Sequence, residues 1–171
     1  MTRLTWAAAL LLGDMAAAQP PGLAARLKTP PTIALPPLEG RRPEAEKSGA
    51  MAVGTHRSLP GSSLKRGRWT KLPGGGSVWR IAVKSPGAEG VRIHFTQFDA
   101  AKGRVWIYAE RDPKPEVAGP YTGSGPNRNG DFWSGIVFSD TLVVEYQPPA
   151  GAPASGAPPF RVSEISHLWR Q

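Results

Sequence analysis

The stretch Val91-Arg92-Ile93-His94-Phe95 alternates apolar and polar residues with a period of two. Successive side chains of an extended strand point to opposite faces, so Val91, Ile93 and Phe95 share one face. Arg92 and His94 lie on the other face. This pattern predicts a half-buried strand whose apolar face is turned toward a core.

The same alternation recurs before and after this stretch. Further strand candidates are residues 79–83, 104–109 and 142–146, with shorter ones at 68–72, 136–138 and 160–162. Turn signals rich in glycine and proline separate them, and helical periodicity is absent from this region. Roughly seven or eight short strands in about 95 residues are typical of an antiparallel sandwich. We therefore predict an all-β domain, a jelly-roll-like β-sandwich over residues 65–171.

The part of the chain before residue 65 has a different composition. Residues 1–18 combine Arg3, an apolar run and Ala16-Ala17-Ala18, which is the pattern of a signal peptide cleaved before Gln19. Residues 19–64 hold three Pro-Pro pairs and are predicted to be a largely disordered, basic linker or pro-segment. No later segment is apolar enough to cross a membrane, so we expect a secreted or periplasmic protein that leaves the membrane after signal cleavage.

The net charge of +8 is concentrated in the N-terminal segment. Residues 19–74 carry ten Lys and Arg against three Asp and Glu, whereas residues 75–171 carry ten against nine. The cations are scattered and have only Trp69 among them as a stacking ring, so we expect no nucleic-acid partner. With no cysteine in the chain, disulfides and thiolate chemistry are excluded.

The residues that could carry catalysis do not assemble into a known pattern. No histidine pair has metal-ligand spacing, and the closest approach to a nucleophile elbow, residues 122–125, lacks its first glycine. Asn127, Asn129 and Asp131 resemble a calcium loop but lack its closing glutamate, which favours a turn at Asn129-Gly130. We expect no catalytic residue, no metal and no cofactor.

A loop rich in glycine and proline, residues 119–126, is followed by Phe132 and Trp133. Such a loop must hold one shape, and it is predicted to serve as architecture or as a contact surface. Its aromatic residues Tyr121, Phe132 and Trp133 are candidates for a partner surface. We expect Trp133 to point inward and leave Tyr121 open.

Trp106 and Tyr108 share one face of a predicted strand. Exposed, they would form a platform on which sugar rings stack. Covered, they would form a second packed layer on a central strand, which is the interpretation that we favour.

Several segments in order resemble one known family. They are residues 78–81, 85–95, 105–108, 119–123 with Phe132-Trp133, and 165–169. This order resembles the non-catalytic N-terminal region of bacterial secreted trypsin-like serine proteases of the lysyl-endopeptidase type, over about residues 65–170. In that family the region precedes a chymotrypsin-like domain, and none of the family's catalytic residues maps onto this chain.

The resemblance implies a propeptide or accessory domain that assists the folding, latency or docking of a serine protease catalytic domain, in cis or in trans. Lys65-Arg66 would offer a processing site. The alternative is a carbohydrate or cell-surface binding module, with polysaccharide as its partner and Trp106 and Tyr108 as its platform.

Overall fold

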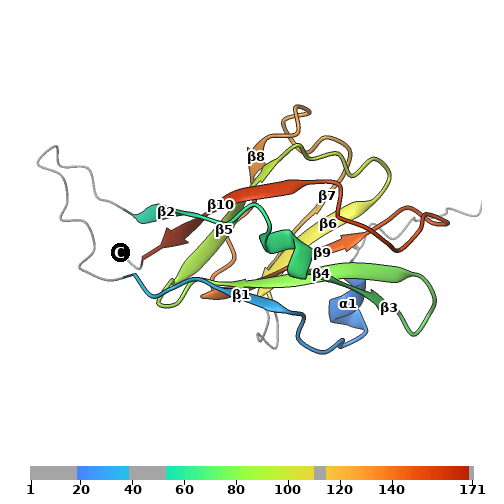
Figure 1. Cartoon of the computed structure of the whole chain (residues 1–171), viewed down its shortest axis with the longest axis horizontal. Helices are drawn as coiled ribbons and strands as arrows, with labels where there is room; N and C mark the ends of the chain where they lie inside the picture. Colours follow the sequence, from blue (N-terminus) through green and yellow to red (C-terminus); the bar gives the residue numbers. More distant parts are fainter. Residues whose placement is uncertain (1–18, 39–52, 110–114, 170–171) are drawn as a thin grey trace, which may run out of the picture.

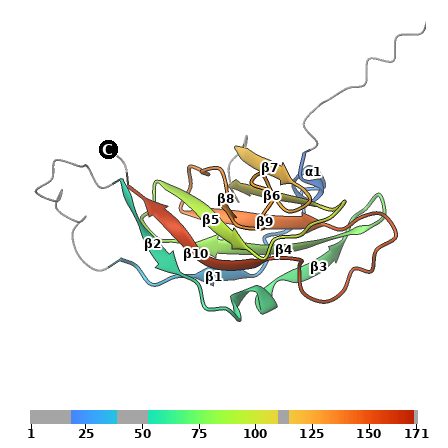
Figure 2. The same ribbon diagram turned by 90° about the horizontal axis from the view of Figure 1, so that it is seen from above.

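The computed structural model describes residues 19–38, 53–109 and 115–169 of the 171-residue chain. The predicted signal peptide lies outside the described residues, as does the middle of the predicted linker. Two sheets form the domain, as Figures 1 and 2 show from two directions.

The six-stranded sheet has the order β1-β4-β9-β6-β7, and β3 also pairs with β4. Its strands are β1 (Thr32–Ala34), β3 (Arg68–Lys71), β4 (Ser77–Lys84), β6 (Arg104–Ala109), β7 (Val117–Tyr121) and β9 (Thr141–Gln147). The pairs are antiparallel except for β1, which runs parallel to the second half of β4. β3 occupies the first half of the same edge.

The four-stranded sheet has the order β2-β10-β5-β8 and is antiparallel throughout. Its strands are β2 (Gly54–Ser58), β5 (Gly90–Thr96), β8 (Phe132–Trp133) and β10 (Arg161–Leu168). The two short helical elements in the described residues are α1 (Pro21–Ala24) and the 3-10 helix η1 (Ser63–Arg66).

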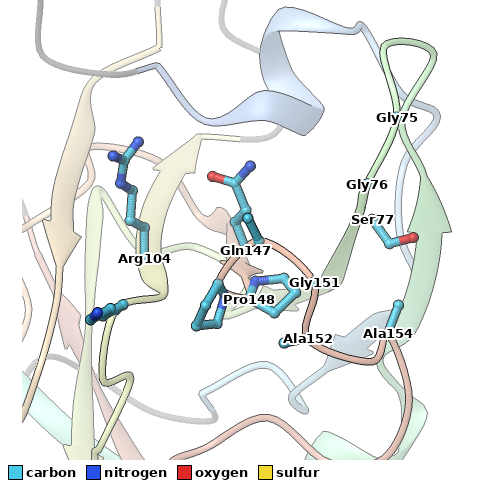
Figure 3. A pocket seen from close by; sticks show the side chains of 12 residues that line it. Gly75, Gly76, Ser77, Arg104, Gln147, Pro148, Gly151, Ala152 and Ala154 are labelled. Atoms are coloured by element: carbon cyan, nitrogen blue, oxygen red, sulfur yellow. The ribbon is translucent and has the colours of Figure 1, made fainter.

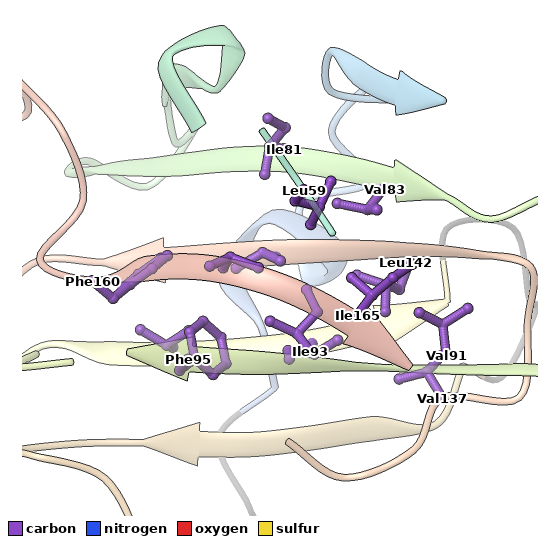
Figure 4. Close-up of a cluster of buried hydrophobic side chains, with 14 of the residues drawn as sticks. Leu59, Ile81, Val83, Val91, Ile93, Phe95, Val137, Leu142, Phe160 and Ile165 are labelled. Carbon is purple, nitrogen blue, oxygen red and sulfur yellow. The ribbon is translucent and has the colours of Figure 1, made fainter. Parts of the chain in front are cut away.

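The core lies between the two sheets and is built from the apolar positions that the alternation predicts (Figure 4). Ile81, Ile93, Leu142 and Ile165 come from four different strands, and all are fully buried. Phe95 lies among aromatic rings at one end of this core. The prediction of an all-β sandwich is therefore confirmed.

The N-terminal segment differs from its predicted state. Part of residues 19–64, expected to be a linker, forms α1, β1, β2 and η1, and two of these elements are strands of the sandwich. The strand signal of β1 in the sequence is weak, because this strand has only three residues and lies between two Pro-Pro pairs. The exposed Lys65-Arg66 pair lies in η1, next to the sandwich edge.

The six-stranded sheet is covered on both faces. Ala82, Trp106, Tyr108 and Val143 form a second buried cluster on its outer face, against which Leu23 packs. Trp106 has no exposed surface and Tyr108 almost none. The second packed layer is present: both rings are buried in this structure and are not exposed as a platform for sugar rings.

Candidate functional site

The outer face of the four-stranded sheet holds a cluster of aromatic and charged side chains. Cross-strand register places Trp133 of β8, His94 of β5 and Glu164 of β10 in one row. The ring of His94 stacks on that of Trp133, with centroids 4.8 Å apart and planes 12° apart. The guanidinium of Arg92 lies over the Trp133 ring at 4.8 Å, and His56 approaches it at 4.9 Å.

His94 also connects two carboxylates. Its Nε2 lies 2.8 Å from Oδ1 of Asp131, and its Nδ1 lies 3.2 Å from Oε1 of Glu164. The second oxygen of Glu164 lies 3.6 Å from Nδ1 of His56. These contacts are partly exposed, so they contribute little to stability and mainly orient the side chains around Trp133.

The sequence-based expectation for Trp133 is wrong. Phe132 pairs with Phe95 and points into the core, so Trp133, one residue later, must point outward. Phe132 is buried and cannot contribute to a surface. Tyr121 is half-buried against the core, and its hydroxyl accepts a hydrogen bond of 2.8 Å from the Gly135 amide.

An apolar groove adjoins this cluster through Arg92. We call it the Phe138 groove; its lining residues are Val53, Glu89, Gly90, Arg92, Ile136, Phe138, Leu168 and Trp169. Phe138 is 67% exposed, the most of the large apolar side chains that are described, and Val53 and Ile136 are exposed too. The sequence reasoning missed it, although three consecutive apolar residues at 136–138 cannot all face one core.

A second hollow lies at the opposite sheet, between the turn at Gly75-Gly76 and the loop after Gln147 (Figure 3). Arg104 and Lys102 give it positive charge. Most of the rest of its lining is glycine, alanine and proline, which offer few polar side-chain groups for ligand recognition. It is therefore the weaker candidate.

The loop of Asn127, Asn129 and Asp131 is a turn. Asp131 N–H donates to Oδ1 of Asn129, and the Asn127 amide donates to the Asp131 carbonyl. In the described ranges no group of three His, Asp or Glu residues could hold a metal ion.

A buried serine–histidine pair, Ser85 and His167, belongs to a hydrogen-bond network that contributes to the fold. The Ser85 hydroxyl lies 2.8 Å from Nδ1 of His167 and accepts a 2.8 Å hydrogen bond from Arg57. Arg57 occupies one of the two acceptor sites of Ser85, and the hydroxyl proton remains available for donation to Nδ1 of His167. Arg57 also bonds the Pro36 carbonyl, so this network ties the two sheets together.

The network predicts a pH dependence of stability. Burial, aided by the charge of Arg57, lowers the pKa of His167 below its usual 6.5. The unfolded chain therefore takes up this proton first, and the stability contribution is lost as pH falls below about 6.5. We expect wild type to lose more unfolding free energy than His167→Asn between pH 7.5 and 5.5, measured by urea titration. Equal losses in both proteins would contradict this assignment.

Comparison with known families now bears on this geometry. Residues 26–169 match the family described as the lysyl endopeptidase N-terminal domain. The chain belongs to this family. No curated protein and no solved structure matches the chain significantly.

Membership in the lysyl endopeptidase N-terminal domain family confirms the resemblance seen in the sequence. It is consistent with a protease-associated, non-catalytic region. The match begins well before residue 65, in agreement with the contribution of β1 and β2 to the sandwich. Within the described part of the chain, no helix is long and apolar enough to cross a membrane.

Proposed function

We propose that this chain is the non-catalytic accessory domain of an exported trypsin-like serine protease and docks on the catalytic domain, in cis or in trans. The observation that carries the proposal is the Phe138 groove, an exposed apolar surface on a member of a protease N-terminal family. Exposed apolar patches of this kind mark interaction sites. Docking there would assist folding or hold the protease latent.

The chemistry of the surface suits a protein partner. Phe138 and Ile136 offer apolar anchors, and Trp133 with Arg92 forms a border of aromatic and cationic groups. Aromatic residues and arginine are enriched at the centres of protein interfaces. A sugar is a poorer fit, because His94 stacks on the Trp133 ring and Arg92 lies over it, while Trp106 and Tyr108 are buried.

Phe138→Ala is expected to weaken binding of the matching protease catalytic domain by about tenfold or more, since truncating an aromatic residue that is a binding hot spot costs about 2 kcal/mol or more. Calorimetric titration of the purified chain into the catalytic domain measures the affinity. Refolding yield and proteolytic activity measured in parallel show whether docking assists or inhibits.

Val117→Ala is the control, because Val117 is also an exposed apolar side chain but lies on the other sheet. It should bind as wild type does. The proposed function fails if wild type neither binds nor changes refolding yield or activity. The assignment of the surface fails if both variants bind equally well.

A further inference from the structure

The outer face of the six-stranded sheet carries buried charged groups. Such groups are not expected on a sheet face that only packs against a covering layer. Register places Arg80 of β4, Glu145 of β9 and Trp106 of β6 in one row across three strands. Glu145 is fully buried and Arg80 nearly so. Burying such groups is unfavourable unless they are paired or hydrogen-bonded. Their partners therefore indicate what this face is built to hold.

Most of these partners are main-chain groups of one segment. Glu145 Oε1 accepts a 2.7 Å hydrogen bond from the Gly22 amide, and Arg80 Nη2 donates a 2.9 Å bond to the Lys28 carbonyl. Glu145 Oε2 accepts a 2.7 Å bond from the Tyr108 hydroxyl, which fixes the carboxylate in place. An acceptor and a donor thus hold the backbone of residues 22–28 at its two ends.

The segment fits the face closely at one point. A β-carbon added at Gly22 would overlap Oε2 of Glu145 and lie 3.0 Å from Cδ of Arg80. Leu23 packs on the apolar cluster beside this contact. Pro20 and Pro21 precede it, and proline fixes the backbone before binding, which reduces the entropy lost on docking.

Elsewhere the fit is loose. A pocket of about 210 Å³ that opens to solvent lies between the segment and the sheet, lined by Leu23, Arg26 and Thr29 on one side and by Arg80 and Tyr108 on the other. Arg80 Nε is buried and has no hydrogen-bond partner among the described residues. Protein cores rarely leave such a buried donor unpaired. The contact resembles a bound ligand more than a core.

We infer that this face is a peptide-binding site for a Pro-Pro-Gly-Leu segment, occupied in this structure by the chain's own Pro20–Lys28. The site reads the main chain through Glu145 and Arg80, requires glycine at the position of closest approach, and takes one leucine on its apolar floor. This inference does not depend on the proposed protease partner.

The test uses the full chain with Gly22→Ala, which loosens the resident segment and leaves the site intact. A synthetic peptide with the sequence of residues 19–28, fluorescently labelled at its C-terminus, serves as the probe. Fluorescence anisotropy should show binding to the Gly22→Ala chain and none to wild type. A peptide with alanine in place of its glycine should bind at least tenfold more weakly.

Two controls separate release of the segment from damage to the fold. Gly61→Ala should behave as wild type, because a β-carbon at Gly61 meets no atom within 4 Å. Hydrogen exchange of the Gly22→Ala chain should show faster exchange in residues 22–28 while β4, β6 and β9 stay protected.

The inference is overturned if residues 22–28 stay protected in Gly22→Ala, or if they are released and the peptide still does not bind. If Gly22→Ala does not fold, Leu23→Ala replaces it as the milder loosening variant. Failure of both variants to fold would show that the segment is part of the core, and this would also overturn the inference.

Discussion

Phe95→Ala is expected to lower the free energy of unfolding by about 3–5 kcal/mol, the range for removing a large buried aromatic side chain. Phe95 has no exposed surface. Its ring centroid lies 5.3 Å from that of Phe98 and 5.2 Å from those of Phe132 and Phe160, with Tyr121 at 6.3 Å. The substitution leaves a cavity among rigid rings, which cannot close around it.

Urea unfolding followed by tryptophan fluorescence measures this loss. Phe138→Ala is the control, since it removes the same side chain from a position that is 67% exposed, and it should change stability by no more than about 0.5 kcal/mol. A loss below about 1 kcal/mol for Phe95→Ala would show that the aromatic cluster contributes little to the stability of the core.

The strands with long period-two signals could be predicted from the sequence. β4, β5, β6 and β9 lie where the alternation placed them. β7 was missed because its Gly119-Pro120 pair is a turn signal, and its open edge tolerates a residue without an N–H group. Residues 136–138 gave a strand signal, but only an isolated bridge between Val91 and Val137 forms there.

The candidate sites were harder to predict from the sequence. They depend on which face of a strand a residue occupies and on which segments pack over that face in the folded chain. Phe132 and Trp133 are adjacent aromatic residues. Alternation with a period of two places them on opposite faces but cannot decide which of them points inward. Pairing with Phe95 decides it. Arg80 and Glu145 look like solvent-facing positions of their strands, but they are buried and bond main-chain groups of Lys28 and Gly22.

The loop of residues 119–126 illustrates the same limit. Its glycines predicted a fixed shape, and Gly125 has a φ of +80° with the ring of Phe132 where its side chain would be. The loop therefore packs closely against the aromatic part of the core at Phe132. Its position could be inferred from the sequence as architecture, but the direction in which its aromatic residues point could not.

Glu145→Ala is expected to destabilise the domain by about 3–5 kcal/mol, comparable to the core substitution, because it breaks a buried charged network by removing one partner. The Gly22 amide and the Tyr108 hydroxyl lose their acceptor. Arg80, 5% exposed, loses the neighbouring carboxylate. The amide and the hydroxyl are then buried without that acceptor, while Arg80 keeps its hydrogen bond to the Lys28 carbonyl. Urea unfolding at neutral pH measures the loss.

Glu145→Gln separates the hydrogen bonds from the charge, because its amide oxygen can still accept from Gly22 and its amide nitrogen can donate to the Tyr108 oxygen.

Burial raises the pKa of Glu145 above its usual 4.5, although the Gly22 amide, Tyr108 and Arg80 oppose the shift. The folded state therefore keeps this proton at pH values where the unfolded chain has lost it. The resulting contribution is fully present below about pH 4.5 and is lost as pH rises through the raised pKa. Wild type should show this slope, opposite in sign to that of His167, and Glu145→Gln should lack it. If the two proteins have identical pH profiles, or if Glu145→Ala is as stable as wild type, the buried carboxylate does not hold the N-terminal segment.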